Sequence, residues 1–321
     1  PLSTSSRVRR TRVVTRPMPS SKHTLQERCG ERNGGSATAA TRHTVAGMDA
    51  NPEIGLSVDV DGIATNYHRA GSGPVVLLVH GSGPGVSAWA NWRLTIPALA
   101  EHFTVIAPDI VGFGFTDRPD GFDYSLDAWR AHLLGFADAL GLDRFSIVGN
   151  SFGGALALSM AAHQPERVER LVLMGAAGVP FPITDGLDRV WGYEPSLATM
   201  RGLLDVFAYD PAFATDELAK LRYDASVRPG FQESFAAMFP APRQRWVDAL
   251  TTPDDVIAAL PHRTLVVHGR DDRVIPLTNA HRLLELIDDS QLHVFGRCGH
   301  WTQIEHAAAF NRLVGDFLAA P

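Results

Sequence analysis

Cysteine is scarce in this chain, and long uncharged apolar runs are missing from it. Only Cys29 and Cys298 occur among the 321 residues, so no disulfide framework is indicated and a reducing environment fits. No uncharged apolar stretch reaches the roughly 18 residues that a transmembrane helix requires. We therefore expect a cytoplasmic protein that does not associate with membranes.

Motifs for metals and phosphates are also missing. The sequence contains no His-Glu-x-x-His and no paired Cys-x-x-Cys, and its histidines lack the spacing of metal ligands. The glycine-rich segment His80–Gly85 completes neither the Gly-x-Gly-x-x-Gly pattern nor a Walker-type phosphate loop. We therefore expect no metal and no cofactor.

Positive charge is concentrated at the start of the chain. Residues 1–47 hold nine Lys or Arg against two Glu, a net charge of +7; because the whole chain carries −6, the remainder carries −13. The net negative charge of the residues after 47 argues against nucleic acid as a partner, since phosphate binding needs clustered cations. The basic leader lacks apolar periodicity and is predicted to be disordered. We interpret it as an extension without function; transit or nonspecific anion binding are the alternatives.

Short apolar runs alternate with helical patterns along most of the remaining sequence. Such runs are typical of strands buried on both faces, and the alternation predicts an α/β fold with a mostly parallel, doubly wound sheet. A hairpin over Ser57–Arg69 adds antiparallel strands at one edge. The other expected strands are Val75–His80, Val105–Pro108, Phe145–Val148, Leu171–Met174, Leu265–His268 and Leu292–Phe295, and the expected helices between them are Trp89–Glu101, Leu126–Leu140, Gly154–His163, Ala280–Leu286 and Glu305–Leu318.

The chain is long enough to carry an insertion in this fold. About ninety residues separate the strand that ends near Met174 from the one that starts near Leu265, far more than a normal crossover needs. Helical patterns in this stretch predict a helical cap over the carboxyl edge of the sheet. We expect a core formed by residues 48–178 and 256–321, a cap formed by 179–255, and cap helices at Leu197–Ala208, Thr215–Ser226 and Gly230–Phe239.

The segment Gly149–Gly153 has the Gly-x-Ser-x-Gly pattern of a nucleophile elbow. It follows a β-branched strand and opens an alanine-rich helix, the context that this motif requires. The glycines permit a very sharp turn, which exposes the Ser151 hydroxyl at a helix N-terminus. The amides of Phe152 and of Ser82, in the His80–Gly85 loop, are candidate donors of an oxyanion hole.

A serine nucleophile needs a base and an acid that orients the base. His300, in a Gly-x-x-Gly-His turn after the last strand, is the candidate base, and Asp271 and Asp272 follow the preceding strand. Loops after parallel strands gather at one edge of a sheet, so these side chains can meet Ser151 there. The order Ser, Asp, His is that of the α/β-hydrolase fold. A third carboxylate, Asp109, is expected to fix the turn at Gly112–Gly114, and His80 is expected to be structural.

With these residues in place, the chain resembles the carbon–carbon bond hydrolases of aromatic meta-cleavage pathways. The similarity runs from about Pro52 to Leu318 and includes motifs in the cap, where α/β-hydrolases in general diverge. The motifs that carry it are HGSGPGVSAWANWRLTIPAL from residue 80, APDIVGFGFTDRP from 107, VGNSFGG from 148, LLDVFAYD from 203, ELAKLRYDAS from 217, PGFQESFAAMFPAPRQRW from 229 and HVFGRCGHWTQIEH from 293.

The resemblance implies a small-molecule substrate of the 2-hydroxy-6-oxohexa-2,4-dienoate type. It favours Asp272 over Asp271 as the acid, and it implies dienoate contacts by Asn91, Asn150, Arg222 and Trp301, with Arg222 facing the substrate carboxylate. A departure from the related biphenyl-type hydrolases is Ser82, where those enzymes have glycine. For Phe207, Met238, Phe239 and Trp246, packing within the cap is expected more than lining of an apolar pocket.

We therefore expect a cofactor-independent hydrolase that cuts ring-fission products of catechol or small alkylcatechols into 2-hydroxypenta-2,4-dienoate and a short acid. Two alternatives stay open: a carboxylesterase or lactonase on the same fold, and a hydrolase-fold receptor without turnover. The oligomeric state is also open, a homo-oligomer included, as is the choice between an acyl-serine and a gem-diol route.

Overall fold

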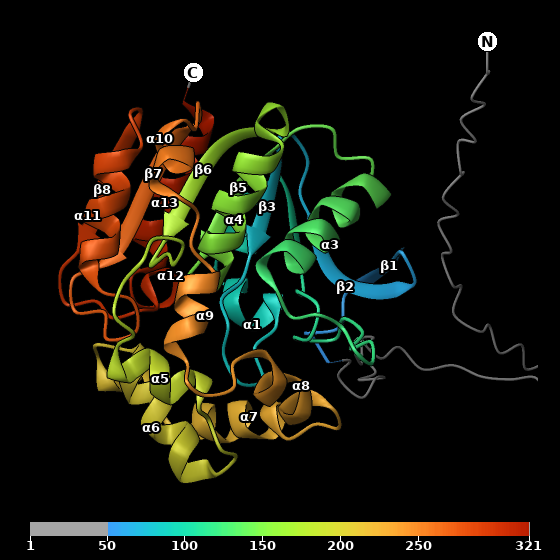
Figure 1. Ribbon diagram of the computed structural model, residues 1–321, viewed down its shortest axis with the longest axis vertical. Helices are drawn as coiled ribbons and strands as arrows, with labels where there is room; N and C mark the ends of the chain where they lie inside the picture. The colour runs from blue at the N-terminus through green and yellow to red at the C-terminus, as the bar shows by residue number, and fades with distance from the viewer. Residues whose placement is uncertain (1–50, 321) are drawn as a thin grey trace, which may run out of the picture. The chain divides into compact units, whose positions relative to one another are not determined.

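The computed structural model describes residues 51–320, and the predicted disordered leader of residues 1–47 lies outside them. Within the described range, eight strands form one sheet in the order β1-β2-β4-β3-β5-β6-β7-β8 (Figure 1). The β1–β2 and β2–β4 pairs are antiparallel and the other pairs are parallel, as the sequence predicts. The strands are β1 (Leu56–Val60), β2 (Ile63–Ala70), β3 (Val75–Val79), β4 (Thr104–Pro108), β5 (Phe145–Asn150), β6 (Val168–Met174), β7 (Arg263–Gly269) and β8 (Ser290–Phe295).

Helices cover both faces of the sheet because its central strands are apolar on both sides. In β3, Val76 and Leu78 pack in one core cluster, whereas Leu77 and Val79 pack in another, as the alternation of side chains along a strand requires. The first cluster includes residues of α1 (Ala88–Trp92), α2 (Ile96–Leu99) and α13 (Ala307–Ala319); the second includes residues of α3 (Leu126–Ala139), α4 (Phe152–His163), α10 (Asp254–Ala258) and α11 (Leu277–Leu286).

The single helix expected over Trp89–Glu101 is wrong, because the chain forms two short helices there. Helix α1 ends at Trp92 and α2 begins at Ile96, with Pro97 in its first turn. A proline inside one continuous helix would remove a backbone donor and clash with the carbonyl of Arg93, whereas proline is well tolerated in a first turn. The expected helix Glu305–Leu318 is confirmed as α13, and a separate short helix, α12 (Thr302–Glu305), precedes it.

Six α-helices lie between β6 and β7 in the sequence, and the first five of them are here called the cap helices. Figure 1 shows four of them grouped below the edge at which the parallel strands end, with α9 leading back to the sheet. Thr184, Ser196 and Thr215 each cap one of these helices by accepting a hydrogen bond from an amide in the first turn. The cap helices are α5 (Asp185–Trp191), α6 (Leu197–Phe207), α7 (Asp216–Ser226), α8 (Phe231–Met238) and α9 (Gln244–Ala249).

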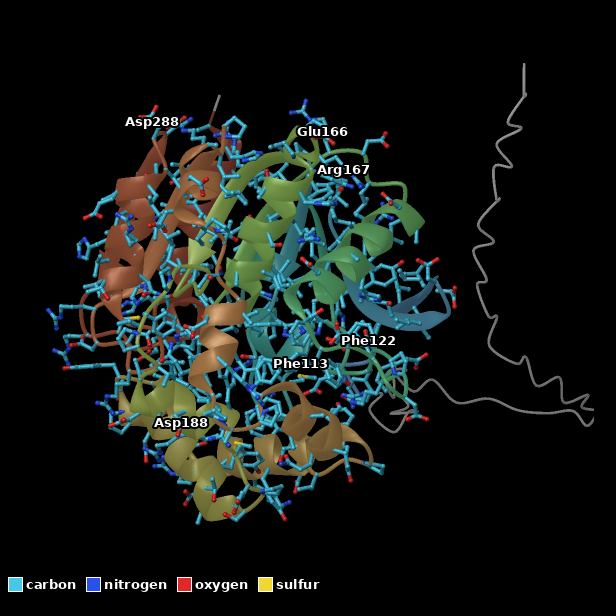
Figure 2. The ribbon with its side chains drawn as sticks, in the orientation of Figure 1. Phe113, Phe122, Glu166, Arg167, Asp188 and Asp288 are labelled. Carbon is cyan, nitrogen blue, oxygen red and sulfur yellow. The ribbon has the colours of Figure 1, made fainter. Side chains whose placement is uncertain are left out.

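Phe113 packs between the cap helices and the core. Its ring packs against His80 after β3, Phe152 at the start of α4 and Phe235 of α8, with centroid separations of 5.4, 6.0 and 6.4 Å. Figure 2 shows Phe113 between the sheet and the cap helices, whereas Glu166 and Asp288 lie at the opposite end of the molecule. The loops that follow the parallel strands therefore face the cap helices.

Candidate active site

Ser151 sits on a strained turn between β5 and α4. Its φ of 55° and ψ of −115° are rare for a residue with a side chain. The turn depends on glycine at both flanks: a Cβ on Gly149 would come within 2.5 Å of the Gly153 carbonyl oxygen, and a Cβ on Gly153 within 2.3 Å of the Val79 carbonyl oxygen. The turn at Ser151 therefore has the close backbone packing at Gly149 and Gly153 that a nucleophile elbow requires.

His300 and Asp272 form a buried hydrogen-bonded pair. His300 Nδ1 donates to Asp272 Oδ2 over 2.7 Å, and both side chains are almost fully buried. Asp272 Oδ1 accepts the amides of Val274 and Ile275 over 2.7 and 3.0 Å. Burial by itself would raise the pKa of the Asp272 carboxyl, but its interaction with His300, together with His268 and the Val274 amide, holds the pKa below its usual value. The carboxylate is therefore ionised and fixes the orientation of the imidazole.

Asp271 is engaged elsewhere. Its carboxylate accepts hydrogen bonds from the Arg270 guanidinium and the Cys298 amide, and neither oxygen is bonded to His300. The structure therefore brings Asp272, rather than its neighbour, to the histidine.

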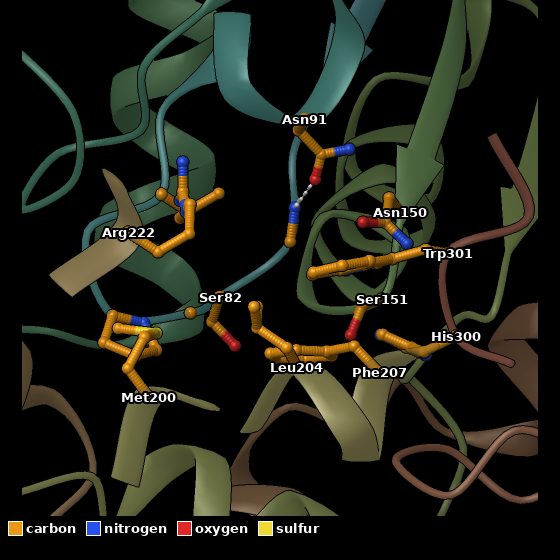
Figure 3. Close-up of a pocket in the computed structure, with 14 residues that line it drawn as sticks. Ser82, Asn91, Asn150, Ser151, Met200, Leu204, Phe207, Arg222, His300 and Trp301 are labelled. Atoms are coloured by element: carbon orange, nitrogen blue, oxygen red, sulfur yellow. Dashed lines mark hydrogen bonds between the residues drawn. The ribbon is translucent and has the colours of Figure 1, made fainter. Parts of the chain in front are cut away.

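Ser151 and His300 line the same cavity, and Figure 3 shows the serine side chain beside the imidazole. Among the contacts of residues 51–320, no hydrogen bond joins the two. Such loose geometry is common before substrate binds and tightens in the complex. The His300 amide donates to the carbonyl of Phe207 at the end of α6 over 2.7 Å, so a cap helix holds the backbone of the candidate base.

The cavity lies between the strand-end loops and the cap helices. The core contributes polar groups to it, and α6 contributes an apolar wall. The residues that line it are Gly81, Ser82, Gly83, Pro84, Val86, Asn91, Asn150, Ser151, Met200, Leu204, Phe207, Arg222, His300 and Trp301.

All four residues that the resemblance assigns to dienoate binding line this cavity. Asn91 Oδ1 accepts the Gly81 amide over 3.2 Å, while its Nδ2 has no partner among the described residues. Asn150 Nδ2 donates to the Met174 carbonyl over 3.3 Å. Trp301 stacks on Phe207 with a centroid separation of 4.9 Å.

Arg222 of α7 is the cation of the cavity. Its Nη2 donates to the Gly85 carbonyl over 2.8 Å, and within residues 51–320 no carboxylate forms an ion pair with it. Burial lowers its pKa to about 10, so the guanidinium stays charged at neutral pH. Among residues 51–320, the Glu53 carboxylate acts on Arg222 electrostatically but forms its ion pair with Arg228. The Arg222 guanidinium, which lines the cavity, is therefore suited to bind a carboxylate from outside.

The two candidate oxyanion donors come from different elements. Ser82 lines the cavity, whereas Phe152 is absent from its lining and is the first residue of α4, a position whose amide has no partner inside the helix. The Phe152 ring is buried and packs edge-on against Trp129 at 4.8 Å.

His80 and Asp109, which were also singled out in the sequence, make hydrogen bonds that support loops. His80 donates through Nδ1 to the Gly81 carbonyl and accepts the Ile110 amide at Nε2, and burial lowers its pKa to about 4. Asp109 accepts the amides of Ala88 and Phe115, and burial raises its pKa to about 6. Both support loops beneath the cavity without lining it.

The four cap residues for which the sequence favours packing over lining a pocket fall into three groups. Phe207 lines the cavity, Met238 is buried, and Phe239 and Trp246 line a separate cavity beside α3. Met200 and Leu204 were missed. They share an i, i+4, i+7 spacing with Phe207, which is the signal that could have found them.

The described residues contain no cluster of His, Cys, Asp or Glu that could hold a metal ion. Nor does any helix in the range 51–320 have the length and apolar character to cross a membrane.

Comparison with known proteins agrees with this geometry. A family model described as the alpha/beta hydrolase fold matches residues 74–307. The 2-hydroxy-6-oxo-2,4-heptadienoate hydrolase of Pseudomonas putida strain F1 is 64% identical over 272 residues, which are 85% of this chain and 99% of the relative. The 2-hydroxymuconate semialdehyde hydrolase of Pseudomonas sp. strain CF600 is 61% identical, over 84% of this chain and 95% of the relative.

A solved structure is also similar. It is a serine-to-alanine variant of the meta-cleavage product hydrolase from Pseudomonas fluorescens IP01, complexed with acetates. The TM-score is 0.83 and the sequence identity 61%, covering 84% of this chain and 98% of that one. The chain therefore belongs to the alpha/beta hydrolase fold family and, within it, to the meta-cleavage product hydrolases.

Proposed function

We propose that this enzyme cleaves a carbon–carbon bond in 2-hydroxy-6-oxohexa-2,4-dienoates, including 2-hydroxymuconic semialdehyde and small alkyl analogues. The products are 2-hydroxypenta-2,4-dienoate and a short carboxylic acid. The observation that carries the proposal is the presence of Arg222 and Ser151 in one cavity, which fits a substrate with a carboxylate at one end and a reactive carbonyl at the other. We further propose that residues 179–255 act as the cap of a cytoplasmic enzyme.

The reaction begins with a proton transfer within the substrate. The enol at C2 becomes a ketone as a proton is added at C5, and this ketone then accepts the electrons of the breaking bond. The oxygen of Ser151, or of a water that His300 activates, attacks the C6 carbonyl to give a tetrahedral oxyanion. Collapse of this oxyanion breaks the C5–C6 bond and expels the dienolate, which takes up a proton to give 2-hydroxypenta-2,4-dienoate. In the serine route, a water molecule then hydrolyses the acyl-serine, which releases the short acid and restores Ser151.

The side chains divide this work. His300 accepts the proton of the attacking hydroxyl, and the ionised Asp272 stabilises the resulting imidazolium. The amides of Ser82 and Phe152 stabilise the oxyanion. Arg222 holds the carboxylate, so that the chain of the substrate extends toward Ser151.

Substrate choice tests the proposal. Ring-fission products with hydrogen, methyl or phenyl at the distal carbonyl would be mixed with enzyme, and the loss of their yellow colour followed. We expect rapid turnover of the hydrogen and methyl compounds, because the resemblance is to the monocyclic branch of the family. Faster turnover of a p-nitrophenyl ester than of any dienoate would instead favour the esterase alternative, and dienoate binding without any turnover would favour the receptor.

Arg222→Ala is expected to lower kcat/KM for the dienoate. The loss corresponds to about 2 to 5 kcal/mol of activation free energy, since the variant leaves the substrate carboxylate buried without its cation. The matched control is Lys220→Ala on the same helix, which also removes one positive charge but from an exposed side chain paired with Asp224. We expect that control to stay near the wild-type value. An equal loss on an uncharged ester analogue would contradict a carboxylate role for Arg222.

A further inference from the structure

The loop that carries Ser82 is attached to the cap by a side-chain hydrogen bond. Trp191, at the end of α5, donates its indole Nε1–H to Ser82 Oγ over 2.9 Å. The two residues are 109 positions apart in the sequence, so the bond joins the cap to the core. Ser82 lines the cavity, whereas Trp191 is not among the lining residues.

The indole is held in one orientation. Its ring stacks on Phe239 with a centroid separation of 4.2 Å and an interplanar angle of 8°, and only 4% of Trp191 is exposed. Because an indole has one N–H and no rotatable donor, a fixed ring means a fixed direction of donation. The Ser82 hydroxyl is therefore bound to a rigid partner.

The rest of the loop shows why such a partner matters. Ser82 stands between Gly81 and Gly83, residues that give the backbone unusual freedom. The loop is held on one side by the bond from the Gly81 amide to Asn91, and on the other by the bond from Arg222 to the Gly85 carbonyl. Trp191 supplies an anchor between these two.

We propose that Trp191 is a positioning residue for the reaction: its N–H holds Ser82 so that the Ser82 amide points where the oxyanion forms. The oxyanion hole of the core then depends on a residue of the cap helices. This inference rests on the proposed function, in which that amide stabilises the tetrahedral intermediate. An amide held in place costs no reorganisation when charge develops, which is the source of its catalytic effect.

Trp191→Phe removes the donor and keeps an aromatic ring against Phe239. In single-turnover experiments we expect the rate of dienoate cleavage to fall about 5- to 20-fold, with KM changed less than about threefold, since the bond acts on the transition state more than on binding. Ser82→Ala removes the acceptor and keeps the backbone amide. We expect a similar fall, and the double variant should fall no further than the larger single effect.

Trp246→Phe is the matched control. Trp246 also lies in the cap and also donates its indole N–H, in this case to the Pro240 carbonyl over 2.7 Å, away from the loop. Its single-turnover rate should equal that of the wild type. A Trp191→Phe rate within twofold of wild type would overturn the proposal, as would effects of Trp191→Phe and Ser82→Ala that simply multiply in the double variant.

The readout is chosen to separate this proposal from the assignment of substrate. If the wild type hydrolyses esters but no dienoate, the proposed function fails, and the same variants are compared on the ester, whose hydrolysis also passes through an oxyanion. If neither is hydrolysed, the rate at which a fluorophosphonate labels Ser151 replaces turnover. Slower labelling of Trp191→Phe supports the positioning role, and unchanged labelling overturns it. Should Trp191→Phe fail to fold, Ser82→Ala gives the same test from the smaller partner.

Discussion

Ser151→Ala is expected to lower kcat for the dienoate by a factor on the order of a thousand or more, with substrate binding largely intact. The substitution removes the hydroxyl that lies beside His300 and leaves Arg222, Asn91 and the cavity walls in place. Stopped-flow absorbance of the yellow substrate measures both quantities, because binding and cleavage change its spectrum at different rates.

A serine elsewhere on the same helix provides the control for this prediction. Ser159 of α4 is buried and accepts a hydrogen bond from Arg130 far from the cavity, so Ser159→Ala tests the effect of losing a buried hydroxyl alone. That variant should cleave the dienoate normally. A near-normal rate for Ser151→Ala would remove this serine from the mechanism and leave water as the sole nucleophile.

Asp272→Asn is expected to lower kcat by about 10³- to 10⁴-fold, as for other triads in which the acid is replaced by its amide. The carboxylate accepts three hydrogen bonds, from His300 and from the amides of Val274 and Ile275. An asparagine has one acceptor oxygen, so it must lose some of them and present an N–H to at least one donor. The imidazole then loses its fixed tautomer. Steady-state kinetics with a folding check by circular dichroism measures the effect.

The adjacent aspartate gives the sharpest comparison for that variant. Asp271→Asn changes the same functional group one residue earlier, where the carboxylate contacts Arg270 and the Cys298 amide instead of the histidine. We expect at most a few-fold change in kcat. A larger loss from Asp271→Asn than from Asp272→Asn would mean that the wrong carboxylate has been assigned.

Much of the sheet could be predicted from the sequence because its strands are buried on both faces. A run such as Val75–Val79 is apolar at every position, and this pattern is local. The elbow was predictable for a related reason, since the turn at Ser151 excludes side chains at Gly149 and Gly153 whatever the rest of the chain does.

The cavity was harder to predict, because its residues meet only through tertiary packing. Arg222 and Asn91 lie far apart in the sequence, and their assignment depended on family resemblance rather than on spacing. Met200 and Leu204 form an apolar stripe on α6 that is consistent with cap packing or with a cavity wall, and the sequence alone does not distinguish these. The short helices α5 and α9 were missed, since seven and six residues are too few for a clear helical period.

The backbone bond between His300 and Phe207 has a consequence for engineering. It is reinforced by Glu305, whose two carboxylate oxygens accept the Gly299 amide next to the histidine and the Tyr209 amide just after α6. Because the Phe207 acceptor is a main-chain carbonyl, no side-chain replacement deletes it. A chimaera that took its cap helices from a distant hydrolase would have to reproduce these contacts to Phe207 and Tyr209; otherwise the candidate base His300 would be misaligned.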